Sequence, residues 1–295
     1  MYNFGTIYET TSVEDALRLK KEHPQAHFLA GGSDILIKVR EGKLAGCDVI
    51  NIYNLDELRG ICLEEDGSIL IRPLTSFTDV AMHPIIKQYI PVLGEAVNQI
   101  GGPQVRNIGT IGGNICNGVT SADSATTLKA YDAMLEISSI DGTRVLPYGE
   151  FNLGPGKVDL REGELLCGIR IRKESYEKTY GHYIKYAMRR AMDIATLGCS
   201  VNVTLSEDKK TVTRLRIAFG VAAPIPIRST TAEASANGHA VNEALLDLVS
   251  EGALADVNPR TSWRASKEFR MQLVKEMAKR ATKAAIEKAG GTING

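Results

Sequence analysis

"FLAGGSDILI", residues 28–37, places two adjacent glycines, a serine and an aspartate between two apolar runs. Glycine tolerates positive φ and lets another group approach the backbone closely. A glycine pair where a strand passes into a helix is therefore either a tight turn or an anion-binding site. On this stretch alone, the turn is the favoured interpretation.

The flanking residues predict alternating helices and strands. Ser12 and Asp15 are typical of a capping box, and the helix that they begin ends at Pro24. Residues 26–30 read as a short strand, 34–43 as a helix and 47–53 as a second strand. The first 60 residues thus predict a βαβ-like unit whose glycine turn lies where a ligand would bind.

The length and composition of the chain limit the classes of function that it could have. A chain of 295 residues is long enough for two domains. Its 35 basic and 35 acidic residues give zero net charge, which argues against nucleic acid or an anionic membrane as the main partner. The sequence has no targeting segment and no stretch of membrane-spanning length. We expect a cytoplasmic protein.

The cysteines and histidines show no metal-binding pattern. Five cysteines are scattered without a CxxC pair, which favours reduced thiols over a disulfide framework, a zinc site or an iron–sulfur cluster. The five histidines form no HExxH motif. No metal site is therefore predicted on this chain, and any metal chemistry belongs to another chain.

From about residue 61 the sequence no longer shows the alternation of helix and strand patterns of the first 60 residues. Helical spacing over 84–101 is interrupted by Pro91, which predicts a boundary between two helices. Further strands are expected at 133–139, 143–147 and 164–172, and the charged stretch 172–182 is the predicted linker.

Antiparallel strands and then helices are expected beyond this linker. The strands are predicted at 183–188, 196–206 and 211–222, and Val201, Val203 and Leu205 alternate within the second. The last helix spans about 265–289. We assign the apolar residues of this region to the core in preference to a partner surface; they are Trp263, Phe269, Leu273, Met277 and Ala281.

A second glycine-rich stretch, residues 101–125, is dense in small and amide side chains. Backbone N–H groups around glycines form anion-binding concavities, and hydroxyl and amide groups add hydrogen bonds. Two such loops could hold a diphosphate from both sides. The alternative is that each loop is a structural turn whose polar residues face water. Neither "GTIGGN" from Gly109 nor "GPGKV" from Gly154 fits the dinucleotide or Walker A templates.

Four stretches together resemble a known family. They are "AGGSD" at 30–34, "QVRNIGTIGGNICNGVTSADSA" at 104–125, "GELLCGIRI" at 163–171 and "YIKYAMRRAMDIATLG" at 183–198. In order and spacing they are similar to the flavin-binding medium subunits of molybdenum hydroxylases. The similarity covers essentially the whole chain, and within the family it points to the FAD-binding subunit of bacterial xanthine dehydrogenases.

The resemblance implies an α+β fold with a defined domain order. Residues 1–175 would form an FAD-binding domain of the PCMH type, with α/β subdomains at about 1–57 and 58–175. Residues 180–290 would form a C-terminal α+β domain with a three-stranded antiparallel sheet and a helical bundle.

The resemblance also implies the cofactor-binding residues. Both glycine loops would contact the FAD diphosphate, Asp123 the sugar or polyol hydroxyls, and Lys185 the flavin ring, where a cation stabilises negative charge. Asp193, after Arg189 and Arg190, would lie near the ring or in an interdomain salt bridge. The implied set is Leu29, Ala30, Gly31, Gly32, Ser33, Asp34, Ile108, Thr110, Ile111, Gly112, Gly113, Asn114, Ser121, Asp123, Leu165, Leu166 and Lys185.

The implied activity is electron transfer within a complex. A large subunit would hold the molybdopterin-type cofactor, a small subunit would hold [2Fe–2S] clusters, and this chain would hold FAD and pass hydride to NAD⁺. Two heterotrimers would pair. No cysteine-rich insertion for an extra cluster is present in the sequence. The alternatives are the flavin subunit of a nicotinate, aldehyde or CO dehydrogenase, a stand-alone flavin reductase, or a flavin-free scaffold.

Overall fold

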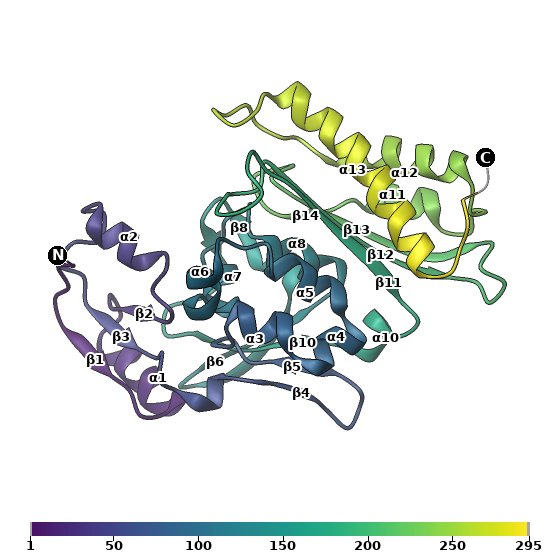
Figure 1. Ribbon diagram of the computed structural model, residues 1–295. Helices are drawn as coiled ribbons and strands as arrows, with labels where there is room; N and C mark the ends of the chain where they lie inside the picture. Colours follow the sequence, from purple (N-terminus) through teal and green to yellow (C-terminus); the bar gives the residue numbers. More distant parts are fainter. Residues whose placement is uncertain (1, 294–295) are drawn as a thin grey trace.

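The computed structural model describes residues 2–293, and its first unit is a small parallel sheet with helices (Figure 1). The sheet has the order β1 (Ile7–Glu9), β3 (Val49–Asn51), β2 (His27–Leu29). Helix α1 (Val13–Glu22) begins at Ser12, whose side chain accepts a hydrogen bond from the Asp15 amide. Helix α2 (Ile35–Arg40) follows the first glycine loop. The predicted βαβ-like unit is confirmed.

The second unit has an antiparallel sheet of five strands. Their order is β4 (Ile61–Leu63), β5 (Ile69–Ile71), β10 (Leu165–Ile171), β6 (Met134–Ser139) and β7 (Gly142–Pro147). The strands expected at 133–139, 143–147 and 164–172 are therefore present. A short hairpin, β8 (Asn152–Gly154) with β9 (Lys157–Val158), follows the one-turn helix α9 (Tyr148–Phe151).

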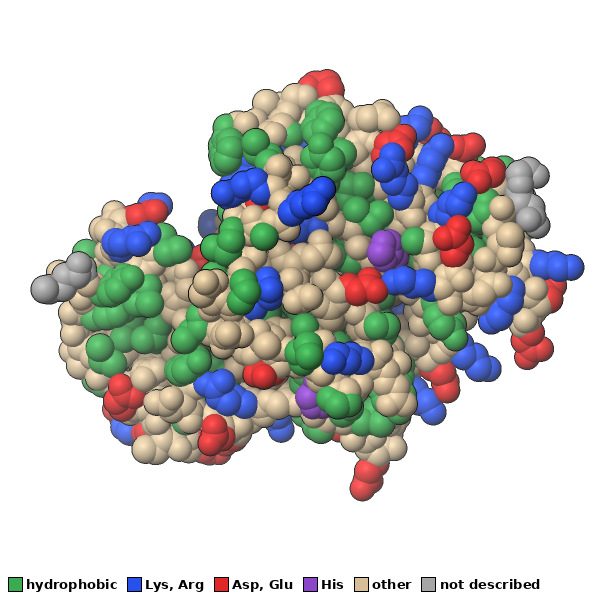
Figure 2. Space-filling view, viewed as in Figure 1, with side chains coloured by type: hydrophobic (Ala, Val, Ile, Leu, Met, Phe, Trp, Pro, Cys, Tyr) green, Lys and Arg blue, Asp and Glu red, His purple; other side chains and the backbone are tan. Residues whose placement is uncertain are grey.

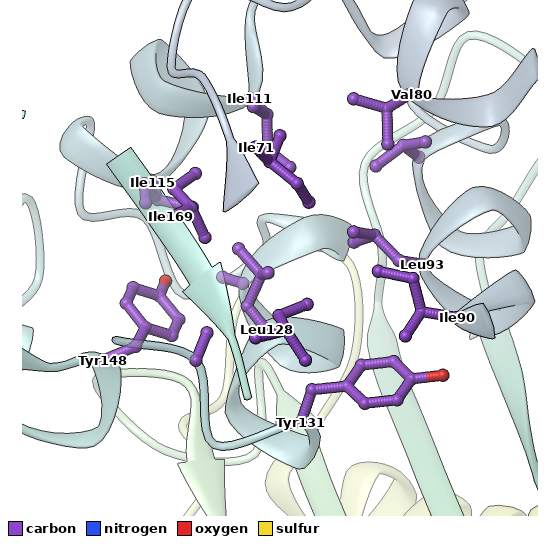
Figure 3. Packing of buried hydrophobic residues seen from close by; sticks show 14 of the residues in the cluster. Ile71, Val80, Ile90, Leu93, Ile111, Ile115, Leu128, Tyr131, Tyr148 and Ile169 are labelled. Atoms are coloured by element: carbon purple, nitrogen blue, oxygen red, sulfur yellow. The ribbon is translucent and has the colours of Figure 1, made fainter. Parts of the chain in front are cut away.

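Short helices fill the space beside this sheet. They are the 3₁₀ turn η1 (Asp56–Leu58), α3 (Phe77–Met82), α4 (Pro84–Tyr89), α5 (Pro91–Val97), α6 (Pro103–Ile108), α7 (Ile111–Cys116) and α8 (Asp123–Ala130). Pro91 begins α5, so the predicted boundary between two helices is confirmed. Figure 3 shows Ile71 and Ile169 of the sheet converging with Leu93 and Leu128 of the helices in one buried cluster.

The third unit is an antiparallel sheet between two layers of helices. Its order is β11 (Tyr180–Tyr186), β12 (Leu197–Leu205), β13 (Val212–Gly220) and β14 (Ile227–Arg228). Helix α8 packs on one face, and α13 (Lys267–Lys288) packs on the other (Figure 1). Helices α11 (Thr230–Ala236) and α12 (Glu243–Asp256) complete that outer layer. Because β12 is covered on both sides, all of its residues except Thr204 are buried.

The expectation of three strands in this sheet is wrong by one. The fourth strand, β14, is two residues long and pairs with Ala218 and Phe219 of β13. It follows Pro224 and Pro226, which have no backbone N–H to donate and so suppress a strand signal in the sequence.

The segment expected to be a linker is also ordered. Residues 172–182 contain the short helix α10 (Lys173–Tyr176) and the start of β11. The Tyr176 ring is buried edge-on against Tyr89, with 5.5 Å between ring centroids, and its hydroxyl donates to the Gly67 carbonyl. The local charge suggested a solvated linker, but one aromatic anchor is enough to fix this segment on the second unit.

The last helix has the expected bounds but a different buried face. Leu273, Met277 and Ala281 lie in the hydrophobic cluster of the third unit, as predicted. Trp263 is 77% exposed and Phe269 is 43% exposed, so their assignment to the core is wrong. In Figure 1 the loop before α13 and the first turns of this helix extend past α11 and α12, which agrees with the exposure of Trp263 and Phe269. Within residues 2–293, no helix is both long and apolar enough to cross a membrane.

Candidate functional site

The first glycine loop connects β2 to α2. Gly32 has φ of +74°, a conformation that residues with a Cβ rarely adopt. At Gly31 a Cβ would lie only 1.9 Å from the Ile108 carbonyl oxygen. Gly31 therefore has no room for a side chain, because the backbones of the two glycine-rich loops touch at this point.

The second glycine loop turns through Gly109 into α7. The Thr110 hydroxyl accepts a hydrogen bond from the Gly113 amide at 3.2 Å, which caps the helix. A Cβ on Gly112 would come within 2.4 Å of the Pro73 Cβ atom. Asn114 Oδ1 accepts from the Ser124 hydroxyl at 2.7 Å, which holds the loop on α8. Both loops are thus held rigidly by their own hydrogen bonds and by close contacts.

The two loops form one side of a cleft between the first and second units. The cleft has a volume of about 950 Å³, at the upper end of the range for small-molecule and cofactor sites. Figure 2 shows the molecule indented between the small lobe that carries β1 and the rest. The implied cofactor residues that line the cleft are Ala30, Gly31, Gly32, Ser33, Asp34, Thr110, Gly112, Gly113, Asn114, Leu165 and Leu166.

A basic wall of the cleft was missed by the sequence analysis. Lys20, His27 and Lys38 all line it. Lys20 Nζ donates to the Pro24 and Ala26 carbonyls at 2.7 Å each, and burial lowers its pKa. Burial and then the two lysines lower the pKa of His27. The two lysine cations favour an anionic ligand, whereas His27 is neutral near pH 7 because its pKa is lowered; the spacing of the three residues in the sequence matches no motif.

Another part of the cleft lining comes from the loop of residues 159–164. Arg144 of β7 holds this loop: its guanidinium donates to Glu164 at 2.7 and 2.8 Å and to the Asp159 carboxylate at 3.0 Å. These hydrogen bonds keep the pKa of Glu164 below its usual range. The apolar part of the lining includes Pro73, Leu74, Phe77, Ile100, Val105 and Leu160.

Asp123 and Lys185 lie apart from this cleft and bind each other. Lys185 Nζ donates to Asp123 Oδ2 and to the Gln99 carbonyl, both at 2.9 Å. The Tyr183 hydroxyl donates to the other oxygen of Asp123. Burial raises the pKa of Asp123, and the Lys185 ammonium opposes that shift. Both oxygens of Asp123 therefore have protein partners in this structure, and its role toward cofactor hydroxyls stays a prediction.

Lys185 and Asp193 line a second, smaller hollow of about 290 Å³ together with Gln99, Arg189 and Arg190. Asp193 accepts hydrogen bonds from the Arg189 and Ile194 amides, both at 2.9 Å. Its carboxylate thus closes a local turn and forms an ion pair with Arg189 of the same loop at 3.7 Å, so the salt bridge is local and not between domains. The nearness of these groups to a flavin ring stays a prediction.

The remaining implied residues also lie outside the cleft lining. Ile111 is fully buried in the core of the second unit, where its side chain supports the loop. Ile108 contributes its carbonyl oxygen at the contact with Gly31. Leu29 ends β2, and Ser121 precedes α8, without forming the cleft surface.

Comparisons with known proteins agree with this geometry. Residues 2–173 match the family described as "FAD binding domain in molybdopterin dehydrogenase". Residues 182–285 match the family described as "CO dehydrogenase flavoprotein C-terminal domain". Both matches bear out the resemblance that the four sequence stretches indicated.

Individual relatives span the whole chain. It is 45% identical over 293 residues to the xanthine dehydrogenase FAD-binding subunit of Escherichia coli O157:H7, covering 99% of this chain and 100% of that one. It is 28% identical over 273 residues to the glyceraldehyde dehydrogenase medium chain of Sulfolobus acidocaldarius, covering 92% and 95%. A solved structure of carbon monoxide dehydrogenase from Hydrogenophaga pseudoflava superposes with a TM-score of 0.92 at 30% identity, covering 98% and 99%.

Proposed function

Because this chain belongs to the FAD-binding medium subunits of the molybdenum hydroxylases, we propose that it is the electron-transfer subunit of a xanthine dehydrogenase that uses NAD⁺ as acceptor. The name of the E. coli relative supports the purine substrate class, which would be oxidised on another subunit. The acceptor is inferred from the resemblance.

The contact between the two glycine loops carries this proposal. At Gly31 and Ile108 the loops meet without room for a side chain, and both line the same cleft. Glycine backbone can approach a diphosphate closely, and the Ser33 hydroxyl and Asn114 amide add polar groups beside it. Lys20 and Lys38 on the neighbouring wall complement the diphosphate charge.

The rest of the cleft suits the other parts of FAD. Ile100, Val105 and Leu160, which line the cleft and are only partly buried, provide an apolar surface on which a flat aromatic ring would pack. The bound cofactor would supply the redox chemistry, accepting electrons one at a time and releasing them as a pair. The chain itself would bind and orient the cofactor and keep part of it out of water.

The complex that we propose has three kinds of subunit. The relatives are named as a subunit or a medium chain, which supports a large and a small partner. We place the molybdopterin-type cofactor on the large partner and the [2Fe–2S] clusters on the small one. Pairing of two heterotrimers in the cytoplasm completes the proposal.

The experiment measures the flavin content of the purified complex and the reduction and reoxidation of that flavin. We expect denaturation to release about one FAD per copy of this chain. Without oxygen, xanthine should bleach the visible absorbance of the flavin, and NAD⁺ should restore it. If nicotinate or an aldehyde bleached the flavin and xanthine did not, the chain would be the flavin subunit of a related hydroxylase instead. Recovery with O₂ and not with NAD⁺ would overturn the acceptor, and a complex without flavin would overturn the whole proposal.

A further inference from the structure

One face of the molecule leaves six large apolar side chains uncovered. They are Tyr186, Met188, Met192, Ile194, Trp263 and Phe269, and each is at least 40% exposed. They come from two segments, 186–194 and 257–269, which we call the Trp263 face. Single exposed apolar residues are ordinary, but a contiguous group marks an interaction site.

Specific contacts hold the two segments together. The Tyr186 and Phe269 rings pack edge to face, with 5.7 Å between their centroids. Arg270 is buried and donates to the Thr196 carbonyl at 3.2 Å and to the Ser262 hydroxyl at 2.8 Å. The loop that carries Trp263 is thereby tied to Thr196, just after the segment that carries Met192, so the two segments lie side by side.

The Trp263 face is basic although the whole chain is neutral. Its two segments contain five basic residues, namely Arg189, Arg190, Arg260, Arg264 and Lys267, and only two acidic ones. The Arg264 guanidinium lies over the Trp263 ring, 4.1 Å from its centroid. Asp193, one of the two acids, accepts from backbone amides of its own loop and forms an ion pair with Arg189 at 3.7 Å, which leaves the other four basic residues in excess over Glu268. Figure 2 shows Lys and Arg side chains beside hydrophobic ones where α13 begins.

The Trp263 face begins at the edge of the cofactor cleft. The Met192 amide donates to the Gly101 carbonyl at 3.2 Å, and a Cβ on Gly102 would meet the Met192 sulfur at 2.4 Å. Ile100 and Val105, on either side of this glycine pair, line the cleft. A protein bound to this face would therefore lie beside the cleft, where electron transfer over a short distance is possible.

We propose that the Trp263 face is the docking surface for the subunit that delivers electrons to this chain, and that this partner presents acidic side chains around an apolar centre. The inference rests on the proposed function. Exposed Trp, Met and Arg are the residue types enriched in interface cores and hot spots. The excess of basic residues selects an acidic partner and disfavours a second copy of the same basic face across a two-fold axis.

Two variants of the chain, assembled with FAD, test this surface. Trp263→Ala removes the aromatic anchor, and Arg260→Glu reverses one exposed charge. Binding to the purified electron-donating partner subunit would be measured by biolayer interferometry at low and physiological salt. We expect Trp263→Ala to weaken binding about 30-fold, as for a tryptophan hot spot. Arg260→Glu should slow association about tenfold at low salt and less at high salt.

The matched controls lie elsewhere on the surface. Leu153→Ala truncates an apolar side chain that is 67% exposed on β8, and Arg280→Glu reverses an arginine that is 74% exposed far along α13. Both should bind the partner like the unmodified chain, and all four variants should keep their FAD. Equal binding by Trp263→Ala and its control would overturn the proposal.

Other outcomes are equally informative. Loss of self-association, without any change in partner binding, would make this face a contact between copies and would overturn the proposal. Binding of single-stranded nucleic acid lost in the same variants, with partner binding unchanged, would also overturn it. If the unmodified chain lacked FAD yet bound the partner through Trp263, the proposed function would fail while the docking surface stood.

Discussion

Gly31 connects the backbone geometry of the two glycine loops with the proposed binding of the cofactor. Its position permits no side chain, because the Ile108 carbonyl oxygen of the second loop occupies the space where a Cβ would lie. Gly32 next to it needs glycine for a different reason, its positive φ. Two adjacent glycines therefore serve two separate requirements, a close approach and a left-handed turn.

Substitution of Gly31 by alanine should weaken cofactor binding. The added Cβ would force the two loops apart, and overpacking of this kind costs about 1–3 kcal/mol. We expect Gly31→Ala to lower the affinity for FAD about tenfold or more. Flavin fluorescence titration of the unfolded-and-refolded apoprotein measures this directly.

Gly154→Ala is the matched control for this prediction, since a Cβ there has no atom within 4 Å. Thermal melts of both apoproteins separate loss of folding from loss of binding. Equal FAD affinity of Gly31→Ala and Gly154→Ala would contradict a role of the loop contact in cofactor binding.

At the scale of elements, the loop of residues 159–164 depends on a strand that is distant in sequence. Arg144 lies on the edge strand β7 and makes paired hydrogen bonds to Glu164, just before β10. The Glu164 carboxylate also accepts from the Arg161 amide at 2.7 Å. One wall of the cleft is therefore held by charged groups, and its stability should depend on pH.

Replacement of Glu164 by glutamine should reveal this dependence. The hydrogen bonds from Arg144 lower the folded-state pKa of Glu164, so its contribution is complete above the unfolded pKa of about 4.3 and is lost as the pH falls through the folded value. We expect Glu164→Gln to lower the free energy of unfolding by about 1 kcal/mol at pH 7.

Urea unfolding at pH 7, 5 and 3.5 would measure this difference, which should hold between pH 7 and 5 and shrink at pH 3.5. The exposed neighbour Glu162, changed to glutamine, serves as the control. A difference between the unmodified chain and Glu164→Gln that is independent of pH would show that the charge of Glu164 does not act through Arg144.

At the scale of the whole molecule, the second and third units are joined by buried polar contacts as well as by packing. Asn202 of β12 donates to the Ala130 carbonyl of α8 at 3.1 Å, and the Thr120 hydroxyl donates to the Ala223 carbonyl at 3.0 Å. Asp132, after α8, forms ion pairs with Arg216 and Arg228 of the third sheet. These contacts fix the sheet that carries Lys185 relative to the cleft.

Neutralising Asp132 should weaken this junction. Burial lowers the pKa of Arg216 and Asp132 opposes that shift, so Asp132→Asn leaves a partly buried guanidinium without its counter-charge. We expect a loss of about 2 kcal/mol in the free energy of unfolding, below the range for a fully buried pair because both partners retain some exposure. Chemical denaturation followed by circular dichroism measures the loss.

The control is Asp247→Asn, which breaks an ion pair with Lys279 on the exposed faces of α12 and α13. Its effect on unfolding should be much smaller. Equal losses for Asp132→Asn and Asp247→Asn would show that the ion pairs of Asp132 do not stabilise the junction between the two units.

The sequence by itself determined the local features and the family. The glycine pairs, the Ser12 cap and the helix boundary at Pro91 each follow from the backbone requirements of one or a few neighbouring residues, so the structure places them as expected. The two glycine loops could be recognised for the same reason, and the family matches confirm the resemblance that they helped to indicate, whereas their contact with the cofactor stays a prediction.

Only the tertiary structure decided which distant residues share a surface. The basic wall of Lys20, His27 and Lys38, and the pairing of Asp123 with Lys185, bring together groups that no local pattern connects. The exposure of Trp263 could not be predicted from the sequence either. An aromatic residue beside an amphipathic helix is typical of a core, and only the packing of the neighbouring elements shows whether it is covered. Burial and charge environment depend on how whole elements pack, whereas turns and caps depend on the residues beside them.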